Sequence, residues 1–325
     1  MQGLTLTAPP VDSGFGPDAP LVCQALAATQ AAAVAAAAWA GRGDPHAADA
    51  AATSAMRAAL GTAAGTGIVI TGEGAKDEAP MLADGELTGD GRPTFDIAVD
   101  PLECTDLCAH GLPGALSTIA IAPQGSLWSP GPAFYMEKLV LPPPARAAAR
   151  ITDPPDTIVQ GVAEALGKEV AELRIVVLDK PRHEGLIADL RSLGAMVVTP
   201  TAGDVAGALA VILPDGGADL LLGIGGTPEG VLAACAARAL SAGMQGRVAP
   251  QRDDEREHVE AAGLSPLRVL ELDDLAAADA AFVATGVTGG LLSSPRRQPG
   301  FVTTESILIA KGAVRYVRQT SPIEE

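Results

Sequence analysis

Short apolar runs separated by turn-forming residues dominate the first part of the chain. They lie at residues 67–71, 95–99, 116–123 and 136–141. Their length and their valine and isoleucine content are typical of buried strands. Two alanine-rich segments, 20–40 and 46–60, predict helices, and Asp44-Pro45 before the second is typical of an N-cap followed by proline. We therefore expect two helices packed on a mostly antiparallel sheet.

After residue 144 the pattern becomes an alternation of helices and short, wholly apolar strands. The prolines at 142–144 form a stiff, extended break before it. Helices are expected at 155–166, 183–193 and 205–213, and strands at 173–178, 196–199 and 219–223. This alternation predicts a parallel sheet covered on both faces. We expect a flexible tail at 1–17, an α+β region at 18–144, and a smaller parallel α/β region at 145–325 that completes the substrate site.

Composition and charge exclude several classes of protein. The net charge is −17 and no cluster of lysine and arginine is present, so a nucleic-acid partner is not expected. Four scattered cysteines are too few for a disulfide framework, which favours a reducing cytoplasm. The apolar stretch at 21–40 contains Gln24, Thr29 and Gln30, and no basic residue precedes it. It is therefore interpreted as a soluble helix, not as a membrane span or signal peptide.

Candidate chemistry begins where the apolar run 95–99 ends. Pro101 lacks an N–H and should end any regular ladder of hydrogen bonds, and Asp100, Glu103 and Thr105 lie within six residues. Two carboxylates and a hydroxyl suit a hard divalent cation and a water molecule that it activates. An acidic, solvent-facing turn explains the same spacing equally well. Asp49 is likewise explained by the helix dipole, as an acid near the helix start.

A glycine-rich turn precedes another expected helix start. Gly223-Ile-Gly-Gly226 is followed by Thr227-Pro-Glu229, which is typical of a capped helix N-terminus. The turn matches neither the dinucleotide fingerprint nor the P-loop, but its N–H groups and the helix dipole could hold an anion. The charged run 252–260 is expected to be a solvated face or a loop.

Several motifs occur in a fixed order between about residues 27 and 318. They are Trp39-Ala-Gly-Arg-Gly-Asp44, Gly72-Glu-Gly-Ala-Lys-Asp-Glu-Ala-Pro-Met81, Asp96-Ile-Ala-Val-Asp-Pro-Leu-Glu103, Tyr135-Met-Glu-Lys138, Lys180-Pro-Arg-His183, Gly223-Ile-Gly-Gly-Thr-Pro-Glu-Gly230, Ala284-Thr-Gly286 and Thr303-Thr-Glu305. Together they resemble class II fructose-1,6-bisphosphatase, a family of lithium-sensitive, metal-dependent sugar phosphatases. The resemblance implies a layered αβαβα fold, which agrees with the α+β and α/β regions expected above.

The resemblance also implies roles for individual residues. Five carboxylates would hold Mg²⁺ or Mn²⁺: Asp49, Glu73, Asp100, Glu103 and Glu229. Catalytic roles fall to Asp49, Glu103 and Thr105, whose hydroxyl would orient the attacking water. The phosphorylated sugar would be bound by Cys104, Tyr135, Lys180, Arg182, His183, Gly203, Asp204 and Gly226. By itself, His183 could equally be a histidine at a helix start.

Some positions depart from the family pattern. Ala75 stands where the family has a second acid, and Cys104 where it has glycine. Glu184 and Ala202 replace aspartates. Three hypotheses follow: a phosphatase with a changed sugar-phosphate substrate, an ordinary fructose-1,6-bisphosphatase, or a non-catalytic binding paralogue. We expect a homo-oligomer, dimer or tetramer. Cys104 and Cys108 could form a redox pair if the turn brings them close.

Overall fold

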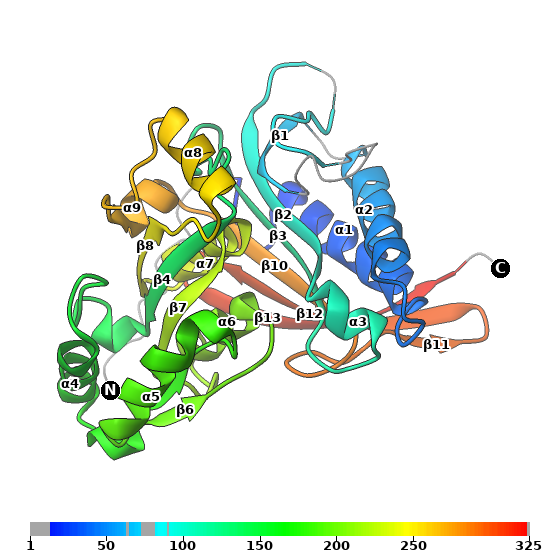
Figure 1. Cartoon of the computed structure of the whole chain (residues 1–325). Coiled ribbons are helices and arrows are strands. Elements are labelled where there is room, and N and C mark those ends of the chain that lie inside the picture. Colours follow the sequence, from blue (N-terminus) through cyan, green and yellow to red (C-terminus); the bar gives the residue numbers. More distant parts are fainter. Residues whose placement is uncertain (1–13, 63–64, 73–81, 90, 324–325) are drawn as a thin grey trace, which may run out of the picture.

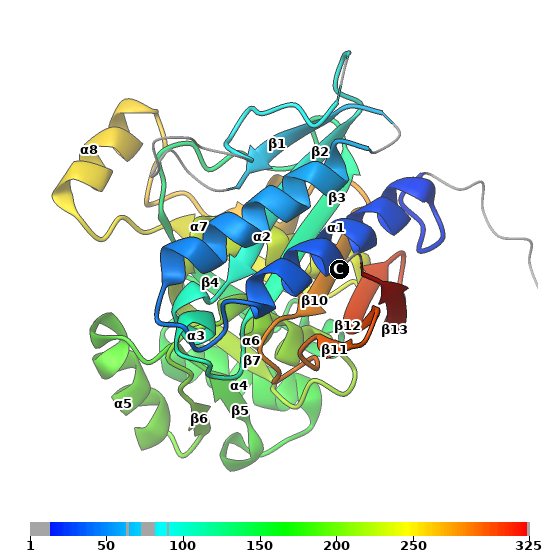
Figure 2. The same cartoon turned by 90° about the vertical axis from the view of Figure 1, so that its right-hand side faces the viewer.

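Two β-sheets with helix layers between and outside them build the molecule, in the order helix, sheet, helix, sheet, helix (Figures 1 and 2). The computed structural model describes residues 14–62, 65–72, 82–89 and 91–323. Most of the expected tail at 1–17 lies outside the described residues, as do Glu73 and Ala75. The layered α/β fold expected from the sequence is confirmed.

The first sheet has the strand order β1-β2-β3-β10-β12-β11, with β13 paired to β12. Its strands are β1 (Gly67–Thr71), β2 (Phe95–Glu103), β3 (Leu116–Pro123), β10 (Ala281–Gly286), β11 (Arg296–Gln298), β12 (Phe301–Ala310) and β13 (Ala313–Pro322). Only the β1–β2 pair is parallel, so the mostly antiparallel character is confirmed. The chain returns to this sheet from its C-terminal part, because β10 inserts between β3 and β12.

Helices α1 (Pro20–Ala37) and α2 (Pro45–Leu60) cover the outer face of the first sheet (Figure 2). By length and composition alone α1 could also cross a membrane. Its buried side chains follow helical spacing and join the core beneath α2 and the sheet: Val22, Ala25, Ala28, Ala32 and Ala36. Small alanines let the helix backbone lie close to the strands. The carboxylate of Asp44 accepts the Ala47 N–H at 2.9 Å, which confirms the predicted N-cap.

The second sheet has the order β6-β5-β7-β4-β8-β9. Its strands are β4 (Tyr135–Leu141), β5 (Arg174–Val176), β6 (Met196–Val198), β7 (Leu220–Gly226), β8 (Gly243–Val248) and β9 (Leu270–Glu271). The three predicted strands β6, β5 and β7 are parallel, as expected. The expectation of a wholly parallel sheet is wrong, because β4 pairs antiparallel with both β7 and β8. The proposed boundary at residue 144 stays a prediction. Each sheet contains strands from both sides of it: β10 to β13 of the first sheet follow residue 144, and β4 of the second sheet precedes it.

The remaining helices fill the middle and outer layers. They are α3 (Thr105–Ala109), α4 (Pro155–Leu166), α5 (Glu184–Ser192), α6 (Asp204–Ile212), α7 (Thr227–Ala239), α8 (Asp253–Ala261) and α9 (Leu272–Leu275). Helix α7 packs against strands of both sheets, with α6 beside it, and α4 and α5 cover the far face of the second sheet (Figure 1). The charged run 252–260 forms helix α8, not a loop, and most of its side chains are exposed.

Candidate active site

Strand β2 extends beyond the expected 95–99 and runs through Pro101 to Glu103, but its regular ladder with β3 ends at Asp100, as the proline predicted. The ladder with β3 is irregular at this point: Asp100 lies opposite Thr118 and Glu103 opposite Leu116. Three steps along β2 thus match two along β3, which is the count of a β-bulge. A proline fits there because the extra residue needs no ladder hydrogen bond. The bulge lets Asp100 and Glu103 line the same cavity, although regular alternation would turn them to opposite faces.

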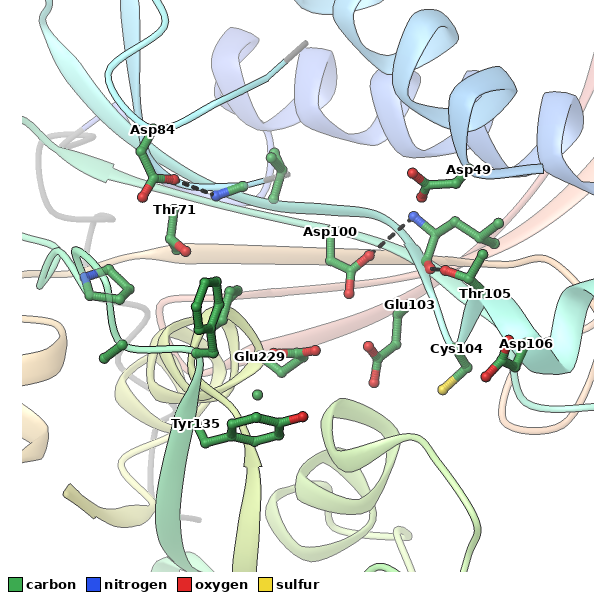
Figure 3. Close-up of a pocket in the computed structure, with 18 of the residues that line it drawn as sticks. Asp49, Thr71, Asp84, Asp100, Glu103, Cys104, Thr105, Asp106, Tyr135 and Glu229 are labelled. Carbon is green, nitrogen blue, oxygen red and sulfur yellow. Dashed lines mark hydrogen bonds between the residues drawn. The ribbon is translucent and has the colours of Figure 1, made fainter. Parts of the chain in front are cut away.

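Three carboxylates meet at the end of this strand. Ligand oxygens of Asp100, Glu103 and Glu229 lie within 4.8 Å of one another (Figure 3). Glu229 comes from the first turn of α7, in the middle helix layer, and so from a distant part of the sequence. The turn that places it is close-packed, because a Cβ on Gly226 would lie 1.9 Å from the Glu229 carboxylate. The acidic turn considered from the sequence is therefore part of a cluster drawn from two layers.

The donor set of this cluster fits a hard divalent cation. Glu103 is only 4% exposed, and its Oε1 is buried without a hydrogen-bond partner among the described residues. Burial, together with the charges of Glu229 and Asp204, raises the pKa of Glu103 to about 8, although a hydrogen bond with Asp100 and the charge of Lys138 act in the opposite direction. Carboxylates this close need protons or a cation to neutralise them. An all-oxygen set suits Mg²⁺ or Mn²⁺.

Thr105 and Asp49 line the same cavity, which has a volume of about 630 Å³. Thr105 begins the short helix α3, and its hydroxyl donates to the Leu102 carbonyl at 2.9 Å. Asp49 projects from α2 (Figure 3). It lies beyond the first helical turn, so the helix-dipole explanation does not account for it. A cluster of carboxylates, a hydroxyl and a further acid thus share one cavity, which is a combination that could hold a metal ion and position a water molecule.

Cys104 takes the left-handed backbone conformation that glycine favours, with φ of 65°. Its side chain lines the cavity, and a Cβ on Gly203 would lie 3.4 Å from its Sγ. Burial, together with the surrounding carboxylates, raises the pKa of the Cys104 thiol far above its usual range. Cys108 is buried, with its Sγ 3.7 Å from the carbonyl oxygen of Ala36. Both cysteines are free thiols here, and the redox pair stays a prediction.

Lys138 and Asp204 form a buried ion pair behind the cluster, at 2% and 7% exposure. The pair fits because two neighbouring positions lack side chains: a Cβ on Gly225 would lie 2.0 Å from Asp204 Oδ2, and one on Gly230 3.2 Å from Lys138 Cε. The Asp204 carboxylate is thus committed to Lys138. We missed the role of Lys138 in the sequence. The sequence feature that could have indicated it is the position of this lysine within the apolar run 136–141, because a buried charge requires a partner.

The predicted substrate residues around His183 form a second group. His183 accepts the Ile224 N–H at Nε2 (2.7 Å), and its Nδ1 lies 2.7 Å from the Leu178 carbonyl oxygen. Because Nε2 accepts a hydrogen bond, the proton of the ring is on Nδ1, and burial lowers the pKa of His183. Arg182 donates to the Ile224 carbonyl at 2.9 and 3.2 Å and stacks over the ring of Tyr135 at 5.1 Å. Both ring nitrogens of His183 are thus engaged by the backbone of its own chain.

The structure brings together some predicted residues and not others. Those that line the main cavity are Asp49, Asp100, Glu103, Cys104, Thr105, Tyr135, Gly226 and Glu229. Those placed outside its lining are Lys180, Arg182, His183, Gly203 and Asp204. Glu73 lies outside the described residues. The roles inferred for all of them stay predictions.

Asp84 is a cavity residue that the sequence did not reveal. It lines the wall near β1, and its Oδ1 accepts the Gly72 N–H at 3.1 Å (Figure 3). Burial raises its pKa. It precedes Gly85 in a turn-rich stretch, where an acid looks like any other turn residue.

The layered fold and the carboxylate cluster define the class of this protein: it is a phosphoric monoester hydrolase of the sugar-phosphatase type. Residues 19–321 match the family model described as "Bacterial fructose-1,6-bisphosphatase, glpX-encoded". The chain belongs to this family. It is 40% identical over 311 residues to fructose-1,6-bisphosphatase 1 class 2 of Escherichia coli (strain K12), covering 91% of this chain and 92% of the relative. The same values hold for class 2 enzymes of Escherichia coli O6:H1 and Shigella flexneri.

Proposed function

We propose that the protein hydrolyses a phosphate monoester of a phosphorylated sugar at the cluster of Asp100, Glu103 and Glu229. The observation that carries this proposal is the buried Oε1 of Glu103, which has no hydrogen-bond partner in the described ranges and lies in a group of carboxylates whose ligand oxygens are within 4.8 Å of one another. These three residues would hold Mg²⁺ or Mn²⁺, and Asp49 and Glu73 would complete the ligand set. The bound metal would neutralise phosphoryl oxygens and lower the pKa of a water molecule.

The side chains around the cluster would orient the reacting water. The Thr105 hydroxyl gives its hydrogen to the Leu102 carbonyl, so its oxygen remains an acceptor for a hydrogen of that water. The carboxylate of Asp49, on the same cavity wall, would take up the proton released on attack. Glu103 is the buried member of the cluster, and its carboxylate would hold the metal ion in place. Activity therefore requires the charged form of these acids.

Fructose 1,6-bisphosphate is the substrate that we propose first, because the relatives carry that activity in their names. Recognition of a second phosphate needs local cations in a chain of net charge −17, and Lys180 and Arg182 would supply them. A second candidate is a different sugar phosphate. It is favoured by the Cys104 side chain, which occupies cavity space that a glycine would leave open.

A panel of phosphorylated sugars and nucleotides, assayed for phosphate release with Mg²⁺ and with Mn²⁺, tests this function. Turnover of fructose 1,6-bisphosphate above the other compounds would support the first substrate, and preference for another sugar phosphate would support the second. Ligand binding without hydrolysis, with no effect of Glu103→Gln on binding, would favour the non-catalytic paralogue. Glu164→Gln, at an exposed position on α4, is the matched control.

Composition and family suggest the setting in which the protein works. We infer a cytoplasmic enzyme that acts as a dimer or tetramer on a small-molecule substrate, without a nucleic-acid or membrane partner. The absence of a basic cluster in the sequence and the metabolic activity named for the relatives support this setting. Sedimentation of the purified protein tests the oligomeric state, and a monomer at all concentrations would contradict it.

A further inference from the structure

Helix α8 contains a buried carboxylate that the proposed reaction does not use. The helix is strongly charged, and its described side chains are exposed except for Glu255 and Val259. These two residues are four positions apart and therefore lie on one face. Val259 packs in a small apolar cluster with Ala133 and Val248. That contact holds α8 against the second sheet but leaves the burial of a charge beside it unexplained.

Glu255 is 0% exposed, and both of its oxygens accept backbone N–H groups. Its Oε1 accepts from Phe134 at 2.8 Å and from Tyr135 at 3.0 Å. Its Oε2 accepts from Gln251 at 2.9 Å. Three N–H donors give both oxygens of this buried carboxylate a hydrogen-bond partner. Two of these three donors belong to Phe134 and Tyr135, so Glu255 binds the backbone where β4 begins.

The carbonyl groups of the same two residues are bound from the other side. The Phe134 carbonyl accepts the N–H of Thr227 at 3.0 Å, and the Tyr135 carbonyl accepts the N–H of Ala249 at 2.9 Å. Thr227 begins α7, the helix that carries Glu229. Both Phe134 and Tyr135 line the main cavity. The backbone of Phe134 and Tyr135, a short part of the cavity wall, is therefore held between Glu255 on one side and, on the other, the N-terminus of α7, the helix that carries Glu229.

We propose that Glu255 is a positioning residue for substrate recognition. By fixing the backbone of Phe134 and Tyr135 it sets the position of the Tyr135 ring, and so the affinity of the cavity for the sugar, without touching the substrate. The inference rests on the proposed phosphatase function. The apolar contact of Val259 already attaches α8, so the carboxylate is needed for the exact placement of this wall. A residue without an acceptor here would leave two N–H groups buried and unpaired.

Glu255→Gln is the main test, because the amide has a single oxygen acceptor, so its NH₂ group must face either the N–H groups of Phe134 and Tyr135 or that of Gln251, and the side chain cannot keep all three contacts. We expect KM for fructose 1,6-bisphosphate to rise about tenfold, with kcat within about twofold, since only the placement of a binding residue changes. Glu257→Gln, at an exposed position two residues further along α8, is the matched control and should leave both constants unchanged. An unchanged KM in Glu255→Gln would overturn the inference.

Two further measurements separate positioning from a general loss of structure. Hydrogen exchange should become faster at the amides of Phe134 and Tyr135 in Glu255→Gln, with core amides of β3 unchanged; unaltered exchange would overturn the inference. In a Tyr135→Ala background, Glu255→Gln should raise KM far less than it does alone, because the positioned side chain is gone. Full additivity of the two KM effects would show that Glu255 does not act through Tyr135. If the wild-type protein releases no phosphate, the proposed function fails, and the exchange measurement alone decides whether Glu255 fixes this wall.

Discussion

Glu103 and Glu255 are both buried carboxylates, but the protein surrounds them in opposite ways. Glu255 accepts three backbone N–H groups, whereas Oε1 of Glu103 has no hydrogen-bond partner among the described residues and two more carboxylates lie within 4.8 Å. Burying a charge is costly unless a partner compensates it. The protein itself compensates the charge of Glu255, whereas that of Glu103 requires a cation from outside. Two acids of similar burial thus indicate a structural contact in one place and a metal site in the other.

An unpartnered oxygen alone does not identify a metal site. Within the part of the chain that the structure describes, Oδ1 of the buried Asp96 also has no partner, yet its Oδ2 accepts the N–H groups of Ser126 and Leu127 at 2.8 and 3.0 Å. Asp96 therefore resembles Glu255 more than Glu103. What distinguishes Glu103 is the combination of an unpartnered oxygen with two neighbouring acids in a cavity of about 630 Å³.

The largest expected effect comes from removing the charge of Glu103. In Glu103→Gln, we expect kcat/KM to fall on the order of 10⁴-fold, about 5 kcal/mol, because a metal ligand is lost. The metal-free variant should be at least as stable as the wild type, because the amide is neutral without the proton that Glu103 must take up when the metal-free protein folds. Phosphate release and thermal unfolding without metal measure the two effects. A variant of low activity that is also less stable would assign Glu103 a structural role like that of Glu255.

Lys138→Met tests an intermediate case, in which a buried carboxylate is balanced by a lysine. Breaking the Lys138–Asp204 pair leaves an unpaired buried charge, so the free energy of unfolding should fall by about 3–5 kcal/mol. Lys138→Met combined with Asp204→Asn removes that charge and should recover a substantial part of the loss. Urea unfolding measures both variants. Equal stability of the single and double variants would mean that the lost packing of Lys138, not the charge, decides the outcome.

The raised pKa of Glu103 predicts that both stability and metal binding depend on pH. Burial raises the pKa of Glu103 from 4.5 to about 8, so between these values the folded, metal-free protein holds a proton that the unfolded chain has lost. Its stability should therefore fall as pH rises through this interval. A metal ion must displace the same proton, so its affinity should rise with pH up to about 8.

Thermal unfolding and Mn²⁺ titration across this pH range test the prediction. Glu103→Gln lacks the titrating group and is the control, in which this component of both pH profiles should disappear. Parallel profiles for the wild type and Glu103→Gln would place the titration elsewhere and weaken the contrast with Glu255.

Local sequence patterns predicted much of the secondary structure, but they did not predict the contacts between segments that are distant in the sequence. The bounds of β3 and α4 follow from apolar runs and proline signals, and the structure has both as expected. The membership of β4 in the second sheet depends on pairing with β7 and β8, more than eighty residues further along the chain. Glu255 and Lys138 were missed for the same reason: a charged residue in sequence gives no sign of the backbone or acid that it meets after folding.

The smallest expected effect concerns Cys104, the residue beside Glu103. In Cys104→Gly the positive φ is no longer strained, which should stabilise the folded state by about 1–2 kcal/mol. Glycine also gives the unfolded chain more conformational freedom, which lowers the free energy of unfolding by about 0.5–1 kcal/mol. Stability should therefore change little. The thiol lines the cavity, so its removal should alter KM for fructose 1,6-bisphosphate by about two- to fivefold if it narrows the substrate site. Cys104→Ser keeps the Cβ and a group of similar size, and should resemble the wild type. If Cys104→Gly and Cys104→Ser have the same KM as the wild type, the side chain does not select the substrate, and the ordinary fructose 1,6-bisphosphate substrate is favoured.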